Sequence, residues 1–217
     1  MNAPPSRILP ATADDEIVAM ALMLYSLPRL QDKVDALVTI PGLGEPKRFS
    51  EAIGDWEKHQ KVGHLLIAGH NTREQTSKPV SPESLQQPPY SLKRTENVII
   101  KLHAEHTGEQ AEWTAQQIQC LSLESIALYA PAYHLLRAYL TFLQAIVFKG
   151  HCWIPIIPVP IINSPSVIIP EFKATAWAMV PGEVQRIHKY MEKGDVASYK
   201  DFQTYIYWLW EQPLLNQ

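Results

Sequence analysis

The sequence predicts an α/β protein with a mainly parallel sheet of about five strands and helices on both faces. Short apolar runs alternate with amphipathic helical patterns along most of the chain, as the β–α–β units of a parallel sheet require. The chain has 217 residues, 46% of them hydrophobic and 19% charged, which suits a soluble globular domain with a substantial core. We therefore expect residues 1–217 to form a single domain.

Short apolar runs are expected to form the strands, because they are rich in aliphatic residues and most are followed by glycine or proline. The first ends before Pro41, the second before Gly69 and the fourth before Pro131. The predicted strands are residues 35–40, 64–68, 97–102, 125–130 and 152–157.

Helical segments are expected where apolar residues recur with the period of an α-helix and where start and stop signals flank them. Thr107 with Gln110 fits a capping box before the third helix. Gly194 follows the fifth helix, and Ser198 with Asp201 three residues later begins the sixth. The predicted helices are residues 12–26, 47–60, 109–119, 132–148, 183–193 and 198–210.

Two long proline-containing segments interrupt this alternation. Residues 72–94 are polar and long for a connection in a compact domain, so we expect a lid over a site or a disordered segment. Residues 158–181 are a second excursion, expected to carry a short ordered segment at residues 172–179. Five of the prolines lie between residues 155 and 170, in a segment whose role the sequence leaves open.

Charge and cysteine content exclude several classes of protein. The formal net charge of −3 and the lack of a long basic run argue against a general nucleic-acid binder. Cys120 and Cys152 provide no disulfide framework, so a reducing, cytoplasmic setting is expected. The N-terminus lacks the order of a signal peptide, and apolar runs at residues 17–25 and 205–210 are shorter than the roughly 20 residues of a transmembrane span. The aromatic run at residues 205–210 is instead expected in the core or at a contact between subunits of a homo-oligomer.

The expected functional site lies where the strands end. Ligands of open parallel sheets bind beyond the carboxyl ends of the strands, near a reversal of strand order. Small and polar residues follow the first four predicted strands, at residues 42–44, 69–71, 105–109 and 132–134. We therefore expect these segments to line one cleft.

His134 and Arg137 are the strongest candidates in this cleft. They lie three residues apart at the start of a predicted helix, so they share a face where the first N–H groups favour anions. The guanidinium of Arg137 suits a phosphate or carboxylate, and the imidazole of His134 suits proton transfer near neutral pH. The alternative interpretations are a hydrogen-bonded structural histidine and an ion pair on the helix surface.

The segment before the third helix offers further candidates. Glu109 can act as a base or bind a ligand hydroxyl, or it can favour the helix N-terminus, and Thr107 is expected to serve as a helix cap. Four potential metal ligands lie here, at a spacing that matches no metal motif: His103, Glu105, His106 and Glu109. We therefore expect no metal site. Gly42-x-Gly44 lacks the third glycine of a dinucleotide fingerprint, so it predicts a tight turn and only a weak phosphate site.

Four short motifs occur in order along the chain: Arg48-x-x-x-Ala52, Ala68-Gly69, residues 106–111, and Tyr133-His134-x-x-Arg137-Ala138. They resemble, in the same order, the RxxxA, SGG, NTxENA and yHxxRA motifs of the YdcF/SanA/ElyC-like family, a domain-of-unknown-function group. The chain departs from the family pattern at several positions. His106 and Gln110 replace the two asparagines of the NTxENA motif, and Ala68 and His70 replace the serine and the last glycine of the SGG turn. Lys101 lies near the position where the family often has an acidic residue, with Glu105 nearby.

This resemblance implies a three-layer, Rossmann-like sandwich, with a core at about residues 35–150 and a helical C-terminal extension at about residues 171–212. Members of the family have been linked to envelope and lipid-carrier metabolism, and one to binding S-adenosylmethionine. S-adenosylmethionine is therefore the one cofactor that the resemblance suggests. Many members carry membrane helices, which this sequence is expected to lack.

The sequence thus predicts a protein that binds a small anionic or nucleotide-like molecule. It is either a hydrolase or transferase acting on a phosphate-bearing substrate, or a non-catalytic binding module that uses the same cleft. The candidate catalytic residues are His134 and Glu109. The candidate ligand-binding residues are Arg137, Tyr133, Thr107, His106, Gly108, His70, Asn71, Gly42, Gly44 and Arg48.

Overall fold

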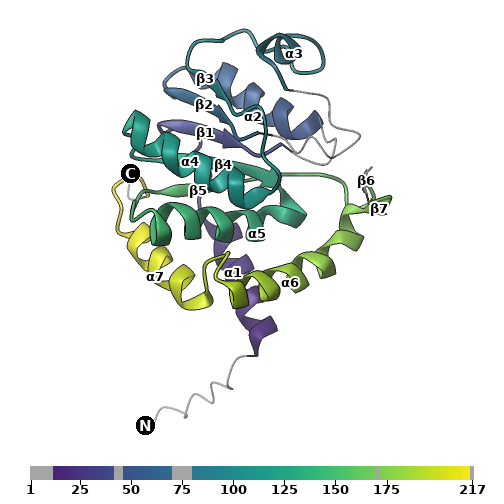
Figure 1. Cartoon of the computed structure of the whole chain (residues 1–217), viewed down its shortest axis with the longest axis vertical. Helices are drawn as coiled ribbons and strands as arrows, with labels where there is room; N and C mark the ends of the chain where they lie inside the picture. Colours follow the sequence, from purple (N-terminus) through teal and green to yellow (C-terminus); the bar gives the residue numbers. More distant parts are fainter. Residues whose placement is uncertain (1–11, 42–45, 70–79, 170–171, 216–217) are drawn as a thin grey trace, which may run out of the picture.

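The computed structural model describes residues 12–41, 46–69, 80–169 and 172–215, and it confirms the predicted α/β fold. The central sheet has five parallel strands in the order β3-β2-β1-β4-β5 (Figure 1). These strands are β1 (Ala36–Thr39), β2 (His64–Ile67), β3 (Val98–Ile100), β4 (Ile126–Pro131) and β5 (Ile156–Ile161). Helices flank the sheet on both faces, which makes the arrangement a Rossmann-like sandwich.

The central strands are buried on both sides. Every residue of β1 and β4 is buried, as expected of parallel strands that helices cover on both faces. Val38 packs into the hydrophobic cluster on one face, and Leu37 packs into the cluster on the other. Ala36 of β1 pairs with His64 of β2 and with Ile126 of β4. The first four predicted strands are therefore confirmed, although β3 is shorter than predicted.

The prediction for the fifth strand was wrong in position. The strand spans Ile156–Ile161 instead of residues 152–157. Proline lacks the N–H group that a sheet hydrogen bond needs, and Pro158 and Pro160 both lie inside this strand. However, β5 is an edge strand, and Pro158 and Pro160 lie two residues apart on the same side of it. Both can therefore turn their missing donors toward the open edge, where no partner strand needs them.

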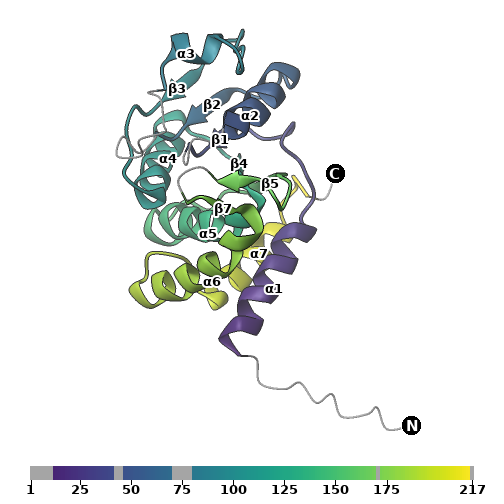
Figure 2. The ribbon, with the colours of Figure 1, turned by 90° about the vertical axis from the view of Figure 1, so that its right-hand side faces the viewer.

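Two groups of helices cover the sheet. On one face, α2 and α3 pack into a cluster with Leu37 and Tyr129. On the other face lie α4, α5 and a π-helix, η1, which continues α5; α1, α6 and α7 form an outer group around them (Figures 1 and 2). The bounds are α1 (Ala13–Ser26), α2 (Pro46–Lys58), α3 (Pro82–Gln86), α4 (Thr107–Leu121), α5 (Ala132–Leu143), η1 (Gln144–Lys149), α6 (Ala176–Lys193) and α7 (Tyr199–Trp210).

Helix α6 differs from the prediction. The sequence suggested a short segment at residues 172–179 and a separate helix at residues 183–193. The structure has one helix, Ala176–Lys193, with Pro181 inside it. Pro181 is the sixth residue of this helix, so its missing N–H leaves only the carbonyl of Trp177 without a helical hydrogen-bond donor. Trp177 is exposed to solvent. As a result Glu183 lies in the body of α6 rather than at a helix start.

Parts of both proline-containing segments lie among the described residues. In the first, residues 72–79 lie outside the described residues, whereas α3 follows and Leu85 and Leu92 are buried on the α2 face. In the second, β6 (Ile168–Ile169) and β7 (Ala174–Thr175) form a small antiparallel pair. Of the C-terminal aromatic run, Tyr205 is fully buried in the core. Within the described ranges, no helix is both long and apolar enough to cross a membrane.

Candidate functional site

The reversal of strand order lies between β1 and β4, at the centre of the sheet. The chain leaves β1 into α2 on one face and leaves β4 into α5 on the other, so a crevice opens between the two strand ends. A pocket of about 220 Å³ lies there, which we call the Glu183 pocket. Its lining is Pro41, Arg48, Ala104, Glu105, His106, Thr107, Gln110, Tyr133, His134, Arg137, Phe172, Glu183 and Arg186.

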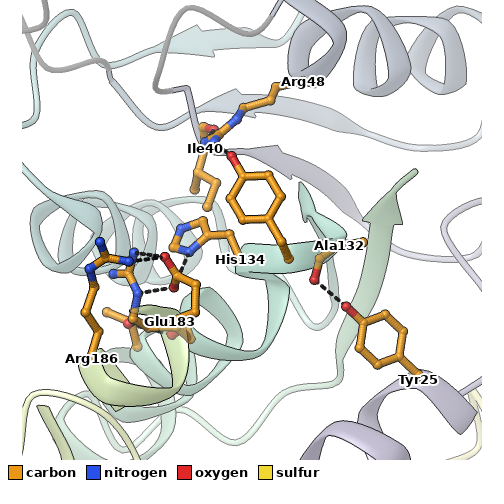
Figure 3. Close-up of polar contacts among 10 residues, drawn as sticks. Tyr25, Ile40, Arg48, Ala132, His134, Glu183 and Arg186 are labelled. Atoms are coloured by element: carbon orange, nitrogen blue, oxygen red, sulfur yellow. Dashed lines mark hydrogen bonds and ion pairs between the residues drawn. The ribbon is translucent and has the colours of Figure 1, made fainter. Parts of the chain in front are cut away.

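The carboxylate of Glu183 is the centre of a polar network in this pocket. Arg137 donates from Nε to Oε2 at 2.5 Å and from Nη2 to Oε1 at 3.3 Å, an arrangement that uses the fork of the guanidinium. Arg186, three residues after Glu183 on α6, donates to Oε1 at 2.8 Å. His134 Nδ1 lies 3.2 Å from Oε2. Figure 3 shows His134 of α5 and Arg186 of α6 pointing toward the Glu183 carboxylate.

Burial and hydrogen bonding together set the protonation states of this network. His134 is only 6% exposed, and burial, reinforced by the charge of Arg137, lowers its pKa to about 4. Burial alone would raise the pKa of Glu183, but the hydrogen bonds from His134 and Arg137 and the charge of Arg137 outweigh it and hold that pKa well below its usual range. At neutral pH Glu183 is therefore ionised and His134 is neutral.

The neutral imidazole has one defined tautomer. Because a carboxylate only accepts, Nδ1 of His134 carries the proton and donates it to Glu183. Nε2 is then an acceptor, and it has no hydrogen-bond partner among the residues that the structure describes. His134 lines the pocket, so Nε2 is the ring nitrogen that can accept a proton from a bound molecule. The burial of His134 and its hydrogen bond to Glu183 also fit the alternative interpretation, a hydrogen-bonded structural histidine.

Arg48 brings a buried positive charge from the other face of the sheet. It lies in the first turn of α2 and is 3% exposed. Its Nη1 donates to the carbonyl of Ile40 at 3.3 Å, and its Nη2 donates to the hydroxyl of Tyr133 at 3.3 Å. Figure 3 places Arg48 across the pocket from Glu183. The hydrogen bond to Tyr133 links the helix after β1 to the helix after β4.

The start of α4 forms another wall of the pocket, and its capping differs from the prediction. The N-cap is His106, whose Nδ1 accepts from the N–H of Glu109 at 3.2 Å, and Thr107 is the first helical residue. The predicted capping box of Thr107 and Gln110 is therefore wrong. The amide of Gln110 instead donates to the carbonyls of Pro41 at 3.0 Å and Gly69 at 2.8 Å. Gln110 thus holds the loops after β1 and β2 against α4.

Glu109, a predicted catalytic residue, is engaged within its own loop. Its Oε2 accepts from the N–H of Glu105 at 2.8 Å, and this hydrogen bond lowers the pKa of the Glu109 carboxyl. The residue does not appear in the described lining of the Glu183 pocket. Its position in the first turn of α4 fits the alternative interpretation, a charge that favours the helix N-terminus.

The predicted ligand-binding residues fall into three groups. Gly42, Gly44, His70 and Asn71 lie outside the described residues. Gly108 lines a neighbouring pocket. Thr107, His106, Tyr133, Arg48 and Arg137 line the Glu183 pocket together with His134. Across the described parts of the chain, no group of three or more His, Cys, Asp or Glu side chains is arranged to hold a metal ion.

Glu183 and Arg186 were missed by sequence reasoning. Both come from α6, and Glu183 lies 46 residues after Arg137 and 49 residues after His134 in the sequence. The available signal was their spacing, since residues three apart on a helix share a face. Dividing α6 at Pro181 placed Glu183 at an exposed helix start, where an acidic residue needs no other explanation.

Comparisons with known proteins assign this chain to no family. No protein-family model matches the chain, and no curated protein matches its sequence. The motif resemblance to the YdcF/SanA/ElyC-like family stays a prediction.

Proposed function

We propose that the Glu183 pocket binds a phosphate-bearing small molecule and that His134 accepts a proton during its hydrolysis or transfer. One observation carries this proposal: a neutral, buried histidine is paired with an ionised carboxylate among three arginines, at the strand reversal of a parallel sheet. This is the place where such sheets bind ligands. It combines a proton acceptor with groups suited to phosphate.

The charges of the pocket favour an anion. Its described lining contains the three arginines Arg48, Arg137 and Arg186, against the two carboxylates of Glu105 and Glu183, while His134 is neutral. The lining therefore carries one net positive charge. Arginine binds phosphate oxygens through parallel N–H groups, and burial strengthens the attraction by reducing the screening of water.

The proposed reaction uses water as the nucleophile. Among the lining residues that the structure describes, the hydroxyl groups belong to Thr107 and Tyr133, and there is no serine or cysteine. In hydrolysis, Nε2 of His134 takes a proton from water while the water oxygen bonds to phosphorus. The ester P–O bond then breaks, and the imidazolium returns the proton to the leaving oxygen. Glu183 orients the ring through Nδ1 and stabilises its charged form, as a carboxylate does in a catalytic triad.

A second candidate is a non-catalytic binding module. The hydrogen bonds of Arg137 favour this candidate, because its Nε and Nη2 both donate to the Glu183 carboxylate. The positive charge of Arg137 is therefore partly compensated before a ligand binds. The motif resemblance would make the chain a YdcF-like protein, and the ligand of such a module would then be nucleotide-like or S-adenosylmethionine. Both candidates place the ligand in the same pocket.

The test combines calorimetric titration with a turnover assay. Inorganic phosphate and S-adenosylmethionine would be titrated into the protein, and a panel of phosphomonoesters and phosphodiesters would be assayed for phosphate release. His134→Asn keeps a donor near the position of Nδ1 but removes Nε2. His188→Asn is the matched control, because His188 lies on α6 and pairs with Asp14, outside the pocket lining.

The outcomes separate the candidates. Turnover that is lost in His134→Asn and kept in His188→Asn, with phosphate binding retained in both, supports the enzyme. Saturable binding of phosphate or S-adenosylmethionine without turnover of any ester supports the module. A protein that binds neither probe and turns over no ester contradicts both.

A further inference from the structure

A second, larger pocket adjoins the Glu183 pocket. Its volume is about 320 Å³, and we call it the Tyr190 pocket. It is lined by His106, Thr107, Gly108, Glu112, Arg137, Thr141, Gln144, Ala145, Lys149, Tyr190, Asp195 and Val196. Three of these residues, His106, Thr107 and Arg137, also line the Glu183 pocket. A molecule held by one pocket can therefore reach the other past Arg137.

The chemistry of the Tyr190 pocket differs from that of its neighbour. Its described lining balances two cationic side chains, Arg137 and Lys149, against two carboxylates, Glu112 and Asp195. An additional charged group on the ligand would therefore gain little there. The two carboxylates and the amide of Gln144 instead offer several acceptors, which suit a neutral group rich in hydroxyl donors.

Tyr190 supplies an aromatic surface beside these acceptors. The residue is partly buried, and the guanidinium of Arg137 lies 5.9 Å from the centroid of its ring. An aromatic face next to polar groups suits a compact ring with one apolar face and hydroxyls around its edge. A sugar ring has this form.

The wall formed by α5 is irregular at this pocket. Gln144, Ala145 and Lys149 belong to η1, the π-helix that continues α5. π-helical turns are rare, and they occur frequently at functional sites. Gly150 ends the segment, where a Cβ atom would lie 2.7 Å from the carbonyl oxygen of Ile146. Glycine at this position thus permits the close backbone approach that ends η1 beside the Tyr190 pocket.

We propose that the Tyr190 pocket is a second subsite, which holds the sugar ring of a sugar-phosphate substrate while its phosphoryl group lies in the Glu183 pocket. Arg137 lies between the two subsites and contacts the link between ring and phosphate. This inference rests on the proposed function, since it assigns the substrate class of the same site.

The test compares probes with and without the ring. Inorganic phosphate, ribose 5-phosphate and glucose 6-phosphate would be titrated by calorimetry into the parent protein and into a double variant, Glu112→Ala with Asp195→Ala. Both of these residues are exposed, so their truncation is compatible with folding. Glu192→Ala is the control, an exposed carboxylate of α6 that is not in the described lining.

The expected result is that at least one sugar phosphate binds about tenfold or more tightly than inorganic phosphate, as hydrogen bonds to charged acceptors allow. In the double variant this advantage disappears while the affinity for inorganic phosphate is retained. Equal affinity for phosphate and both sugar phosphates in the parent protein overturns the subsite and leaves the proposed function standing. If the parent protein binds none of the three probes, both the subsite and the proposed function are overturned. An advantage that survives in the double variant also overturns the assignment of the ring to this pocket.

Discussion

His134 donates a hydrogen bond to Glu183 over 3.2 Å, although 49 residues separate them in the sequence. The contact joins the helix that follows the central strand β4 to a helix of the C-terminal part of the chain. It fixes the tautomer of the histidine and leaves Nε2 for the pocket. The predictions below test this pair and the residues around it.

The pH dependence of stability should reveal His134. Its pKa is about 4 in the folded protein against 6.5 as the ordinary value, so the unfolded chain binds more protons between these limits. Stability should therefore fall by about 1–3 kcal/mol as the pH is lowered from about 6.5 to about 4. Glu183, whose pKa is also lowered, adds a loss in the same direction below its ordinary value of 4.5. Urea unfolding at several pH values measures this, and His134→Asn should flatten the upper part of the curve. An equally steep curve in that variant would assign the effect to other groups.

Removing the charge of Glu183 should destabilise the protein. Glu183→Gln leaves Arg137 and Arg186 facing each other without their shared carboxylate. A buried ion pair that loses one partner typically costs about 3 kcal/mol. Chemical denaturation measures the difference, with Glu192→Gln as the exposed control on the same helix. A stability equal to that of the control would show that the network contributes little to the fold.

Arg137→Lys should reduce both stability and ligand affinity. Lysine keeps the charge but cannot reproduce the two N–H contacts that Arg137 makes with Glu183. We expect a loss of about 1–2 kcal/mol in unfolding free energy and roughly tenfold weaker phosphate binding. Thermal unfolding and calorimetry on the same samples measure both. Unchanged phosphate affinity in a destabilised variant would make Arg137 a purely structural residue.

The cap of α4 can be tested separately. His106 accepts from the N–H of Glu109, so His106→Ala should cost about 1 kcal/mol. Asparagine is among the strongest N-caps, and His106→Asn should therefore keep or slightly raise the stability. The two variants differ mainly in their capping ability, and urea unfolding compares them directly. If His106→Ala is as stable as the parent, the hydrogen bond to Glu109 has no energetic role.

The sheet could be predicted because its strands are uniform apolar runs. Leu37 and Val38 point to opposite faces and both are buried, so the run at β1 needs no polar alternation. The bounds of β5 could not be read from the segment alone, because a strand tolerates Pro158 only at an edge, and the edge is a property of the sheet.

The site could be predicted only in part. His134 and Arg137 could be identified because both lie at the start of the helix that follows a predicted strand. Their spacing of three residues places them on one face of that helix. Their partner Glu183 could not be found in this way, because only tertiary packing brings α6 beside α5. For Glu109 the sequence left open a base, a contact with a ligand hydroxyl and a charge at the helix N-terminus, and in the structure its carboxylate accepts from the N–H of Glu105.

The most direct test of the account is a long-range ¹H–¹⁵N spectrum of the histidine rings at pH 7, recorded during a titration with inorganic phosphate. His134→Asn identifies the signals of His134. The account predicts that Nδ1 carries the proton, that Nε2 is unprotonated in the free protein, and that the Nε2 signal moves saturably as phosphate binds. A proton on Nε2 in the free protein, or signals of His134 that phosphate leaves unchanged, would contradict the assignment of this pocket as a phosphate site with His134 as its proton acceptor.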